Sequence, residues 1–594
     1  MPDIVPDSMK VRWDLAGIPG GIPAPGTIHA TIDATGDTTN RLSAITTALN
    51  AAPPGTRVLL GPGLFYVGAG FRKKSGVELC GSGMSATRLI FTGTHGFGVD
   101  LGNGDQDWPY NTTGDAITSD VPKGSTVLPM AGGTANWVAG DIAVLTQLGP
   151  DYTADPTLIE CSSTSSNKDR LRRQYVEIAS KTADSLTLVV PTYWDLALSR
   201  SPVAHRMARG FHVGGGLRDL TLDFSEGHVT RGVDVLGAVR CYMQRVRVLE
   251  PDNYGIYLMS SFQCEVKECY IDLNYGTGGN NGAGILMERL GACRVWDNIM
   301  YRCVPHTEMN FGCAGCVVAY NFANDSTAGT SPGFAQAGSL NVNHGPHCAF
   351  NLLEGNHAPS VWSDGWFGSA SELLVARNRL HGTNEDGPGV GKTETSRCVD
   401  LGRFTRKCPI VGNSLGMPQS WWSSRYGLTM IKEPETSNYP SNRPVIYKLG
   451  YPNLGNQGFT GTASLIDGDP WADWPTGAGA GGYQERDLDV AATTLLKHNW
   501  NGYDNAIHAS EALAEGETIA DSYFLSEKPD WFGTLAWPPY DPNSPVIDPV
   551  ESAKRIPAGY RYYMGGDPPM TNIPTHNRVR LARAPRFFAA VPIQ

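Results

Sequence analysis

Short apolar segments separated by polar turns run through almost the whole chain. Near the N-terminus, Leu42, Ile45 and Leu49 fall at helical spacing and predict an amphipathic helix over residues 38–50, with a threonine at its start as the cap. A short helix ahead of the first strands suits the end cap that a stacked repeat structure requires. Strands are predicted to follow at residues 57–60, 64–67, 77–79 and 89–91.

Residues 95–210 follow a different pattern. Alternating apolar and polar residues, joined by polar loops, predict a separate β-rich insertion here. Its expected strands are residues 125–128, 138–145, 175–178 and 186–190.

An internal repeat begins near residue 211 and indicates the architecture. Seven segments align on one lead position, and the steps between successive leads are 23, 29, 23, 35, 22 and 35 residues. A basic coil of 22 or 23 residues with loop insertions explains all six steps. The lead positions are Cys241, Cys264, Cys293, Cys316, Asn351, Leu373 and Cys408.

A second register of asparagines lies five residues after the leads. Asparagine tolerates left-handed backbone and can hydrogen-bond to its equivalent in the next coil, about 4.8 Å away. One more coil is predicted at Asn499, which makes residues 417–493 a large insertion. The other members of the register are Asn298, Asn321, Asn356, Asn378 and Asn413.

These patterns predict an all-β chain, a single-stranded right-handed parallel β-helix with an N-terminal helical cap, a β-rich insertion and a C-terminal extension. The expected divisions are a cap with the first coils, the insertion module, the main β-helix, a large insertion, and a last coil with the tail. Their boundaries are 1–94, 95–210, 211–416, 417–493 and 494–594.

Composition and charge limit the classes of molecule that the protein is expected to bind. Seventy glycines and 41 prolines suit many turns, and the formal charge of −11 argues against nucleic acid or an anionic membrane. No apolar run is long enough to span a membrane, and the first ten residues lack a basic and apolar secretory signal, so we expect a removed signal or a virion-borne protein. The lead cysteines are expected to be buried, stacked free thiols rather than disulfides.

Two stretches resemble known β-helix proteins. The turn Gly36-Asp37-Thr38-Thr39 and the strand turn 60–66 (LGPGLFY) resemble the opening of pectate-lyase-like right-handed β-helix proteins, which implies the fold but not pectate as substrate. The opening 16–23 (AGIPGGIP) and the tail around 522–533 and 556–562 are similar to a broad group of mostly uncharacterised bacterial and phage β-helix proteins. That second resemblance implies no activity.

We identify candidate catalytic residues by counting eight residues back from each lead position. Early coils give the apolar Val233, Ile256 and Ile285, whereas later coils give polar residues that include Glu308 and Asp400. Two carboxylates on nearby coils are what glycoside hydrolysis requires, so we predict Glu308, Asp364 and Asp400 as catalytic acids. Histidines in the same strip are predicted to orient them, namely His306 and His344. Alternatively, the acids cap strands or pair with nearby arginines.

The remaining candidates are expected to contact sugar. Aromatic rings can stack on pyranose faces, and polar residues beside them can bind hydroxyl groups; Trp421 and Trp422 are further aromatic candidates. No metal signature stands out, although a structural or substrate-bridging calcium is a further expectation. The predicted binding residues are Trp362, Trp366, Arg377, Asp325, His347 and Glu354.

Together these features favour an extracellular or virion-associated protein, monomeric or trimeric, whose partner is a polysaccharide or cell-surface glycan. The first hypothesis is an endo-acting glycoside hydrolase. The second is a lyase for uronate-containing glycan, with Arg377, Arg379, Lys392 and His306 as candidate bases. The third is a glycan-binding tailspike or adhesin without catalysis.

Overall fold

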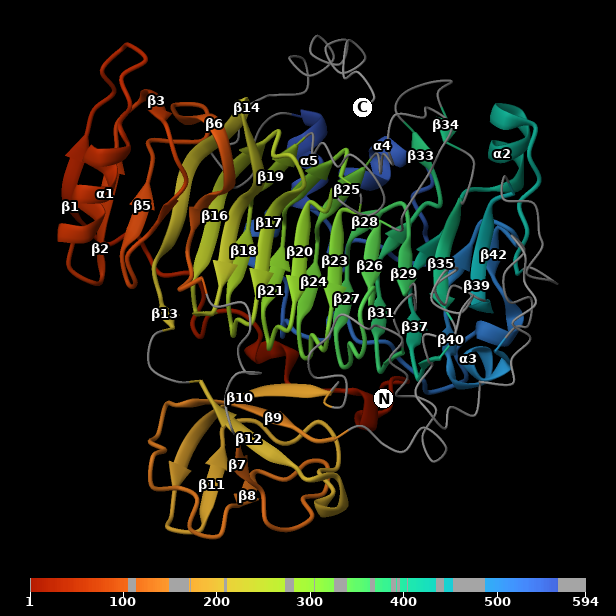
Figure 1. Ribbon diagram of the computed structural model, residues 1–594. Helices are drawn as coiled ribbons and strands as arrows, with labels where there is room; N and C mark the ends of the chain where they lie inside the picture. The colour runs from red at the N-terminus through yellow and green to blue at the C-terminus, as the bar shows by residue number, and fades with distance from the viewer. Residues whose placement is uncertain are drawn as a thin grey trace, which may run out of the picture.

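The computed structural model is a right-handed parallel β-helix with a separate β module beside it (Figure 1). It describes residues 2–104, 114–148, 170, 172–207, 211–272, 282–303, 305–324, 339–363, 369–385, 391–392, 396–402, 404–433, 443–451 and 487–564. Among the described residues, no helix is long and apolar enough to cross a membrane.

Each coil of the solenoid contributes one strand to each of three parallel columns. Column one carries the candidate acids and consists of β14 (Gly216–Leu236), β17 (Tyr254–Met259), β20 (Ile285–Glu288), β23 (Thr307–Asn310), β26 (Leu340–Val342), β29 (Val361–Ser363), β35 (Arg397–Gly402) and β39 (Val445–Tyr451).

Column two begins one residue after each lead position. Its strands are β16 (Tyr242–Leu249), β18 (Glu265–Lys267), β21 (Arg294–Trp296), β24 (Val317–Ala319), β27 (Leu352–Glu354), β31 (Leu374–Ala376), β37 (Pro409–Val411) and β40 (Leu495–Lys497). This register confirms the repeat alignment. The lead cysteines are buried free thiols, as are all the cysteines among the described residues.

Column three follows the asparagine register. Its strands are the second half of β16, then β19 (Tyr270–Asp272), β22 (Ile299–Tyr301), β25 (Phe322–Asn324), β28 (His357–Ala358), β32 (Arg379–Leu380), β38 (Ser414–Leu415) and β41 (Trp500–Asn501).

The predicted asparagines form a continuous ladder at the turn between columns two and three. At each step, the backbone N–H and Nδ2 of one asparagine both donate to Oδ1 of the next, at 2.9–3.1 Å, from Asn298 through to Asn499. The left-handed backbone lies one residue earlier than expected, for example at Asp297 (φ 56°) and Tyr320 (φ 55°). The asparagines therefore contribute their amide hydrogen bonds, and their neighbours supply the turn.

The N-terminal end is closed by a helix and the first coils. Helix α1 (Leu42–Ala51) starts later than predicted, and its first amide donates to Asn40 Oδ1 (3.0 Å) rather than to a threonine. Ile45 and Leu49 of α1 are buried in the solenoid core. The strands here are β1 (Thr27–Ile32), β2 (Thr56–Leu60), β3 (Gly63–Val67), β4 (Phe71–Arg72), β5 (Glu78–Cys80) and β6 (Thr87–Asp100). Because β6 pairs with β14, the coils continue past residue 94.

The β module forms its own six-stranded sheet, in the order β7-β12-β9-β10-β11-β8, with antiparallel pairings (Figure 1). An apolar cluster that includes the buried Trp137 and Leu145 forms its core and extends to Phe350 of the solenoid. The strands are β7 (Asp115–Ala116), β8 (Val127–Pro129), β9 (Ile142–Thr146), β10 (Arg173–Lys181), β11 (Ser185–Leu188) and β12 (Val203–Arg206).

The stretch 417–493, expected as an insertion, also contributes to the solenoid. Its strand β39 pairs with β35 and begins the last coil, which β40 and β41 complete. Helix α2 (Gln419–Tyr426) buries Trp422 in the core at this end, whereas the sequence suggested that Trp422 stacks on sugar. Helix α3 (Leu488–Thr493) packs on β39.

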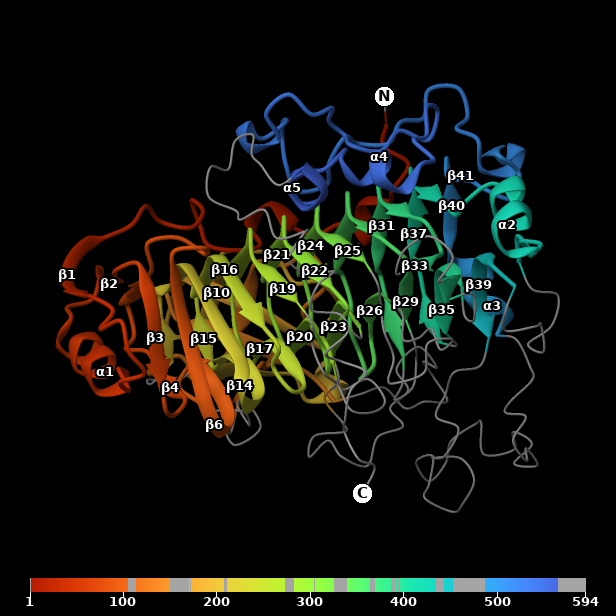
Figure 2. The same ribbon diagram turned by 90° about the horizontal axis from the view of Figure 1, so that it is seen from above.

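The C-terminal extension, residues 502–564, lies over columns two and three (Figure 2). It carries the short helices α4 (Pro549–Ala553) and α5 (Pro557–Met564), and Arg561 of α5 donates to the buried Asp297 at 2.9 Å. Two small strand pairs complete the turns of the solenoid: β13 (His212–Val213) with β15 (Ala238–Val239), and β30 (Ala370–Ser371) with β36 (Thr405–Arg406).

Candidate functional site

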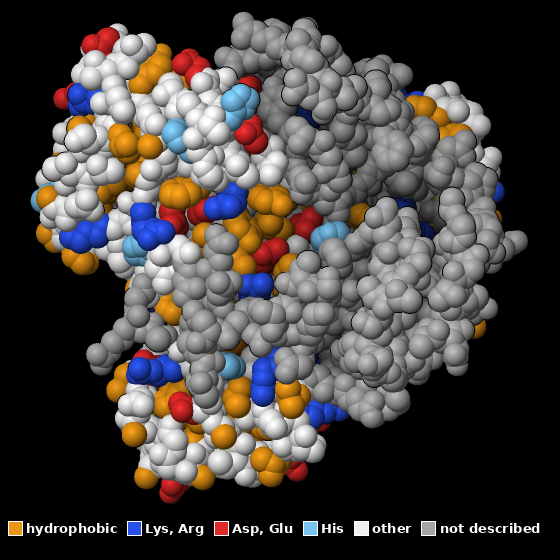
Figure 3. All heavy atoms as spheres, viewed as in Figure 1, with side chains coloured by type: hydrophobic (Ala, Val, Ile, Leu, Met, Phe, Trp, Pro, Cys, Tyr) orange, Lys and Arg blue, Asp and Glu red, His pale blue; other side chains and the backbone are white. Residues whose placement is uncertain are grey.

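The outward-facing side chains of column one form a polar strip, which we call the column-one face. Strand residues alternate inward and outward, so each outward position lies beside its equivalent in the next coil, about 4.8 Å away. Figure 3 shows acidic, basic and hydrophobic side chains gathered on this side of the molecule. One register row runs Asp100, Asp234, Tyr257, Leu286, Glu308, Asn341, Trp362, Asp400 and Lys448.

This register corrects the count of eight residues back from the leads. Val233, Ile256 and Ile285 are inward-facing and pair in one row, whereas Glu308 pairs with the outward Leu286. The loops between column one and the lead positions differ in length, so a fixed count slips by one residue. Because the strand period is two, that slip exchanges the two faces of the sheet. The predicted change from apolar to polar residues therefore compares inward-facing residues of the early coils with outward-facing residues such as Glu308.

Glu308 and Asp400 both lie on the column-one face, but they are not neighbours. Three strand steps separate β23 from β35, which places them about 14 Å apart. Glycosidase carboxyl pairs are separated by about 5–9.5 Å. Asp400 is fully buried and accepts from Arg397 at 2.9 Å and Lys448 at 3.3 Å. The structure therefore places Asp400 in an ion cluster and does not pair it with Glu308.

A closer carboxylate neighbour of Glu308 is Glu288, on the adjacent strand β20. Glu288 pairs with Asn310, and Glu308 lies two residues before Asn310 on the same face, which separates the two glutamate Cα atoms by about 8 Å. Burial raises the pKa of the Tyr254 phenol, and the charges of Glu308 and Glu288 raise that pKa further. The Tyr254 hydroxyl therefore lies close enough to both carboxylates for their charges to affect it.

Local hydrogen bonds hold each member of the pair. Asn310 Nδ2 donates to Glu308 Oε1 at 2.7 Å, and Asn310 Oδ1 accepts from the backbone N–H of Gly345 at 3.0 Å. The Tyr257 hydroxyl donates to Glu288 Oε2 at 2.6 Å. Glu308 is 4% exposed, whereas Glu288 is half-buried, so the two carboxylates experience different environments.

Apolar and cationic groups border the pair. Tyr254 and Tyr257 lie with ring centroids 5.8 Å apart, next to an outward apolar patch that includes Leu286. Arg231 sits 5.7 Å from the Tyr257 ring and is bound to Asp234 at 2.8 Å. Burial raises the pKa of Asp234 to about 6. The site therefore offers two carboxylates, two phenols, an apolar surface and a guanidinium.

The predicted histidines are occupied by protein contacts. His306 is buried between Asn324 O and Ser339 Oγ, both at 2.8 Å. His347 is buried between the hydroxyls of Ser369 and Ser371, and burial lowers its pKa well below the usual value. Both imidazoles therefore fix turns within the solenoid. His344 is half-buried at the end of the column-one strand region.

Two predicted sugar-binding residues instead anchor the C-terminal extension. Glu354 accepts from the Tyr320 hydroxyl at 2.8 Å and from the backbone N–H of Tyr523 at 2.7 Å. Arg377 donates to the backbone oxygen of Ile519 at 2.9 Å. Both lie at column two, away from the column-one face.

Of the other candidates, Trp362 does lie on the column-one face. The Arg397 guanidinium lies 4.7 Å from its ring centroid, and its buried indole Nε1 has no hydrogen-bond partner among the described residues. Arg379 is buried and donates to Gly416 O at 2.8 Å on the covered side. Three predicted residues lie outside the described residues, Asp325, Asp364 and Trp366, as does the side chain of Lys392.

Sequence reasoning missed Glu288, Tyr254, Tyr257 and Asn310. The alternation of residues around the inward Ile285 could have found Glu288, because it places Leu286 and Glu288 on the outward face. Within the described part of the chain, no group of three or more His, Cys, Asp or Glu side chains is arranged to hold a metal ion. The calcium expectation stays a prediction.

Comparisons with known proteins find only distant structural similarity. No protein-family model matches the sequence, and no curated protein matches it. The tailspike gp61 of Pseudomonas phage phi297 has a TM-score of 0.44 and 12% sequence identity, covering 71% of this chain and 73% of its own. The gp54 tailspike of Acinetobacter baumannii bacteriophage AP22, in complex with A. baumannii capsular saccharide, has a TM-score of 0.38 and 12% identity, covering 70% and 62%.

An enzyme of stated activity is also similar. The pectate lyase Pel9A has a TM-score of 0.31 and 12% identity, covering 67% of this chain and 78% of its own. At these identities and scores, the likeness carries no information on activity.

Proposed function

We propose that the column-one face binds an extended polysaccharide and that Glu288 and Glu308 hydrolyse a glycosidic bond within it. The observation that carries this proposal is the placement of two outward carboxylates on adjacent coils, about 8 Å apart at Cα, beside one phenol that senses both. Glutamate side chains on adjacent coils with this Cα spacing can bring their carboxyl groups to the separations of about 5–9.5 Å that glycoside hydrolysis uses.

The environments of the two glutamates suggest their roles. Glu308 is the more buried, and a carboxyl removed from water is more readily kept protonated, so we assign it the general acid. Glu288 is half-buried, more accessible to water than Glu308, and accepts a hydrogen bond from Tyr257 that orients its carboxyl group. We assign Glu288 the base or nucleophile, with Tyr254 and Tyr257 as the apolar surface for a sugar ring.

The architecture suits a polymer more than a small sugar. Equivalent outward positions repeat about every 4.8 Å along the solenoid, so neighbouring coils can contact successive units of one chain. Trp362, two coils beyond Glu308, lies in the same row. Such a substrate lies outside cells, and a cysteine column of free thiols suits folding in a reducing cytoplasm before release, as for a virion-borne protein.

The test is a panel of polysaccharides assayed for new reducing ends, with variants Glu308→Gln and Glu288→Gln. Each substitution is expected to lower turnover by at least about 10²-fold, the scale of a lost acid–base group, with an unchanged melting temperature. Glu226→Gln is the matched control, because Glu226 is an exposed glutamate on β14. Full turnover in both active-site variants would refute the assignment.

A second candidate is β-elimination on a uronate-containing glycan. Arg231, beside Tyr257, supplies the positive charge that such a reaction uses to neutralise the substrate carboxylate. Ultraviolet absorbance of an unsaturated product would establish this chemistry. Tight glycan binding without either product would establish the third candidate, a binding spike.

A further inference from the structure

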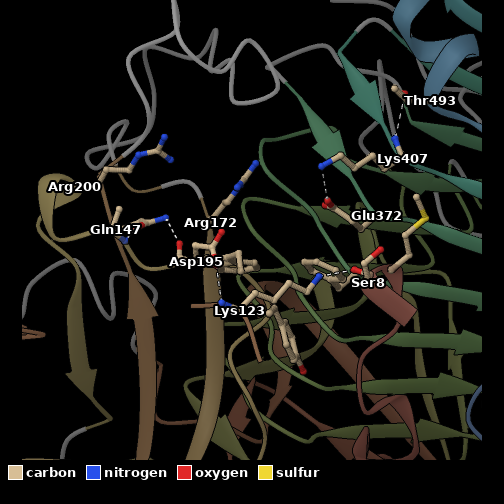
Figure 4. A pocket seen from close by; sticks show the side chains of 14 residues that line it. Ser8, Lys123, Gln147, Arg172, Asp195, Arg200, Glu372, Lys407 and Thr493 are labelled. Atoms are coloured by element: carbon tan, nitrogen blue, oxygen red, sulfur yellow. Dashed lines mark hydrogen bonds and ion pairs between the residues drawn. The ribbon is translucent and has the colours of Figure 1, made fainter. Parts of the chain in front are cut away.

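A cavity of about 820 Å³ lies where the N-terminal segment, the β module and the solenoid meet (Figure 4). The module contributes Lys123, Arg172 and Arg200 to its wall, and the solenoid contributes Glu372 and Lys407. Neither Glu288 nor Glu308 lines it, so this junction cavity is separate from the column-one face.

The charge of the wall is positive. Lys123, Arg172, Arg200 and Lys407 give four positive charges, against two negative charges from Asp195 and Glu372. Figure 4 shows Arg172 and Arg200 on the module side and Lys407 with Glu372 on the solenoid side. A net excess of two cations around one cavity favours an anionic occupant.

Both acids already have partners within the wall. Asp195 Oδ1 accepts from the backbone N–H of Lys123 at 2.7 Å, and Glu372 Oε1 lies 3.7 Å from Lys407 Nζ. By contrast, the Arg200 guanidinium makes no hydrogen bond or ion pair among the described residues, and no buried partner holds it. It is the donor of this wall that is most available to a ligand.

The cations also act on one another. Burial lowers the pKa of Lys123, and the positive charges of Lys407 and Arg172 lower that pKa further, against the raising effect of Glu372 and Asp195. An anion bound between these side chains would relieve their repulsion.

The wall of the cavity also contains aromatic rings. Trp194 and Phe350 stack with ring centroids 6.0 Å apart, and Lys123 Nζ lies 4.3 Å from the centroid of the Phe350 ring. The combination of a planar apolar surface and fork-shaped guanidinium donors matches a sugar ring that carries a carboxylate.

We propose that the junction cavity binds an acidic sugar unit. Arg200 and Arg172 bind its carboxylate, and its ring packs against the surface formed by Trp194 and Phe350. This site is independent of the chemistry proposed for Glu288 and Glu308. A glycan held there would bridge the β module and the solenoid.

Calorimetric titration of the full-length Glu308→Gln chain with a short oligogalacturonate tests the proposal, because that background prevents turnover. Binding is expected, and the methyl ester of the same oligosaccharide should bind at least tenfold more weakly because it lacks the charge. Adding Arg200→Ala should weaken binding about tenfold or more, and Arg200→Lys less. Lys528→Ala, which removes an exposed charge in the C-terminal extension, should change nothing.

Several results would overturn the proposal. Equal affinity for the acid and its ester would exclude carboxylate recognition. Unchanged binding in the Arg200→Ala variant, with a normal melting temperature, would place the oligosaccharide elsewhere. Displacement by equimolar inorganic phosphate would show a simple anion site without sugar recognition. A chain that binds here but has no hydrolytic activity would leave this site standing and remove only the proposed function.

Discussion

Two outer surfaces of the solenoid carry buried acids, and they differ in what holds those acids. Over columns two and three, Asp297 and Glu354 are bound by Arg561 and the Tyr523 backbone, which belong to the C-terminal extension. On the column-one face, Glu308 is bound by Asn310, a residue of its own strand. A buried acid tied to a distant segment fastens the fold. The hydrogen bond between Asn310 and Glu308 is local, and it orients the Glu308 carboxyl group within its own strand.

The largest effect is expected on the covered side. Arg561→Ala leaves the fully buried Asp297 without its guanidinium partner and should cost about 3–5 kcal/mol of unfolding free energy. Urea unfolding measures the loss, with Lys528→Ala as the control. Glu308→Gln should show almost no loss in the same experiment. Equal losses in Arg561→Ala and Glu308→Gln would erase the distinction between the two surfaces.

The asparagine ladder should show the next largest effect. Asn356→Ala removes the acceptor for the backbone N–H and Nδ2 of Asn321 and leaves buried donors unpaired, at a cost of about 3 kcal/mol. Asn50→Ala, at an exposed position in α1, is the matched control. A loss below about 1 kcal/mol would mean that water replaces the amide.

The third effect is a change in how stability depends on pH. Burial raises the pKa of Glu354 to about 7, so the folded state binds a proton that the unfolded state releases between its usual pKa and 7. The contribution of Glu354 to stability should therefore fall as pH rises through that window, by up to about 1.4 kcal/mol per pH unit. Glu354→Gln should flatten the profile measured by unfolding from pH 5 to 8. Glu226→Gln should leave the profile as it is, and an unchanged slope in Glu354→Gln would contradict the assignment.

The periodic parts of the molecule could be predicted from the sequence. From the coil of Cys293 onward, a ladder asparagine lies five residues after each lead position, with no loop between them, so the two registers align directly. Column one is separated from the leads by loops of unequal length. That irregularity caused the one-residue slip at Glu308 and concealed Glu288, and the same irregularity hid β39 within the stretch 417–493.

Contacts between residues that are far apart in the sequence could not be predicted from the repeat pattern. Glu354 and Arg377 resembled groove residues because they sit in polar turns, yet both bind the segment 519–523, which is more than a hundred residues away in sequence. Similarly, Trp422 looked like a sugar platform, and the structure uses it to close the end of the core. A turn sequence predicts that a polar side chain lies at the surface of the coil. It does not predict which distant segment packs against that side chain.

The ladder also has a consequence for how such a protein can diversify. The coil from Asn351 to Leu373 has 22 residues, and the coils on either side of it have 35, yet Asn321, Asn356, Asn378 and Asn413 stay in unbroken hydrogen-bonded contact. Length can therefore be added on one side of a coil while the opposite side keeps its spacing. Related proteins built on this frame can therefore differ in the loops around the column-one face, one loop at a time, while the solenoid itself stays unchanged.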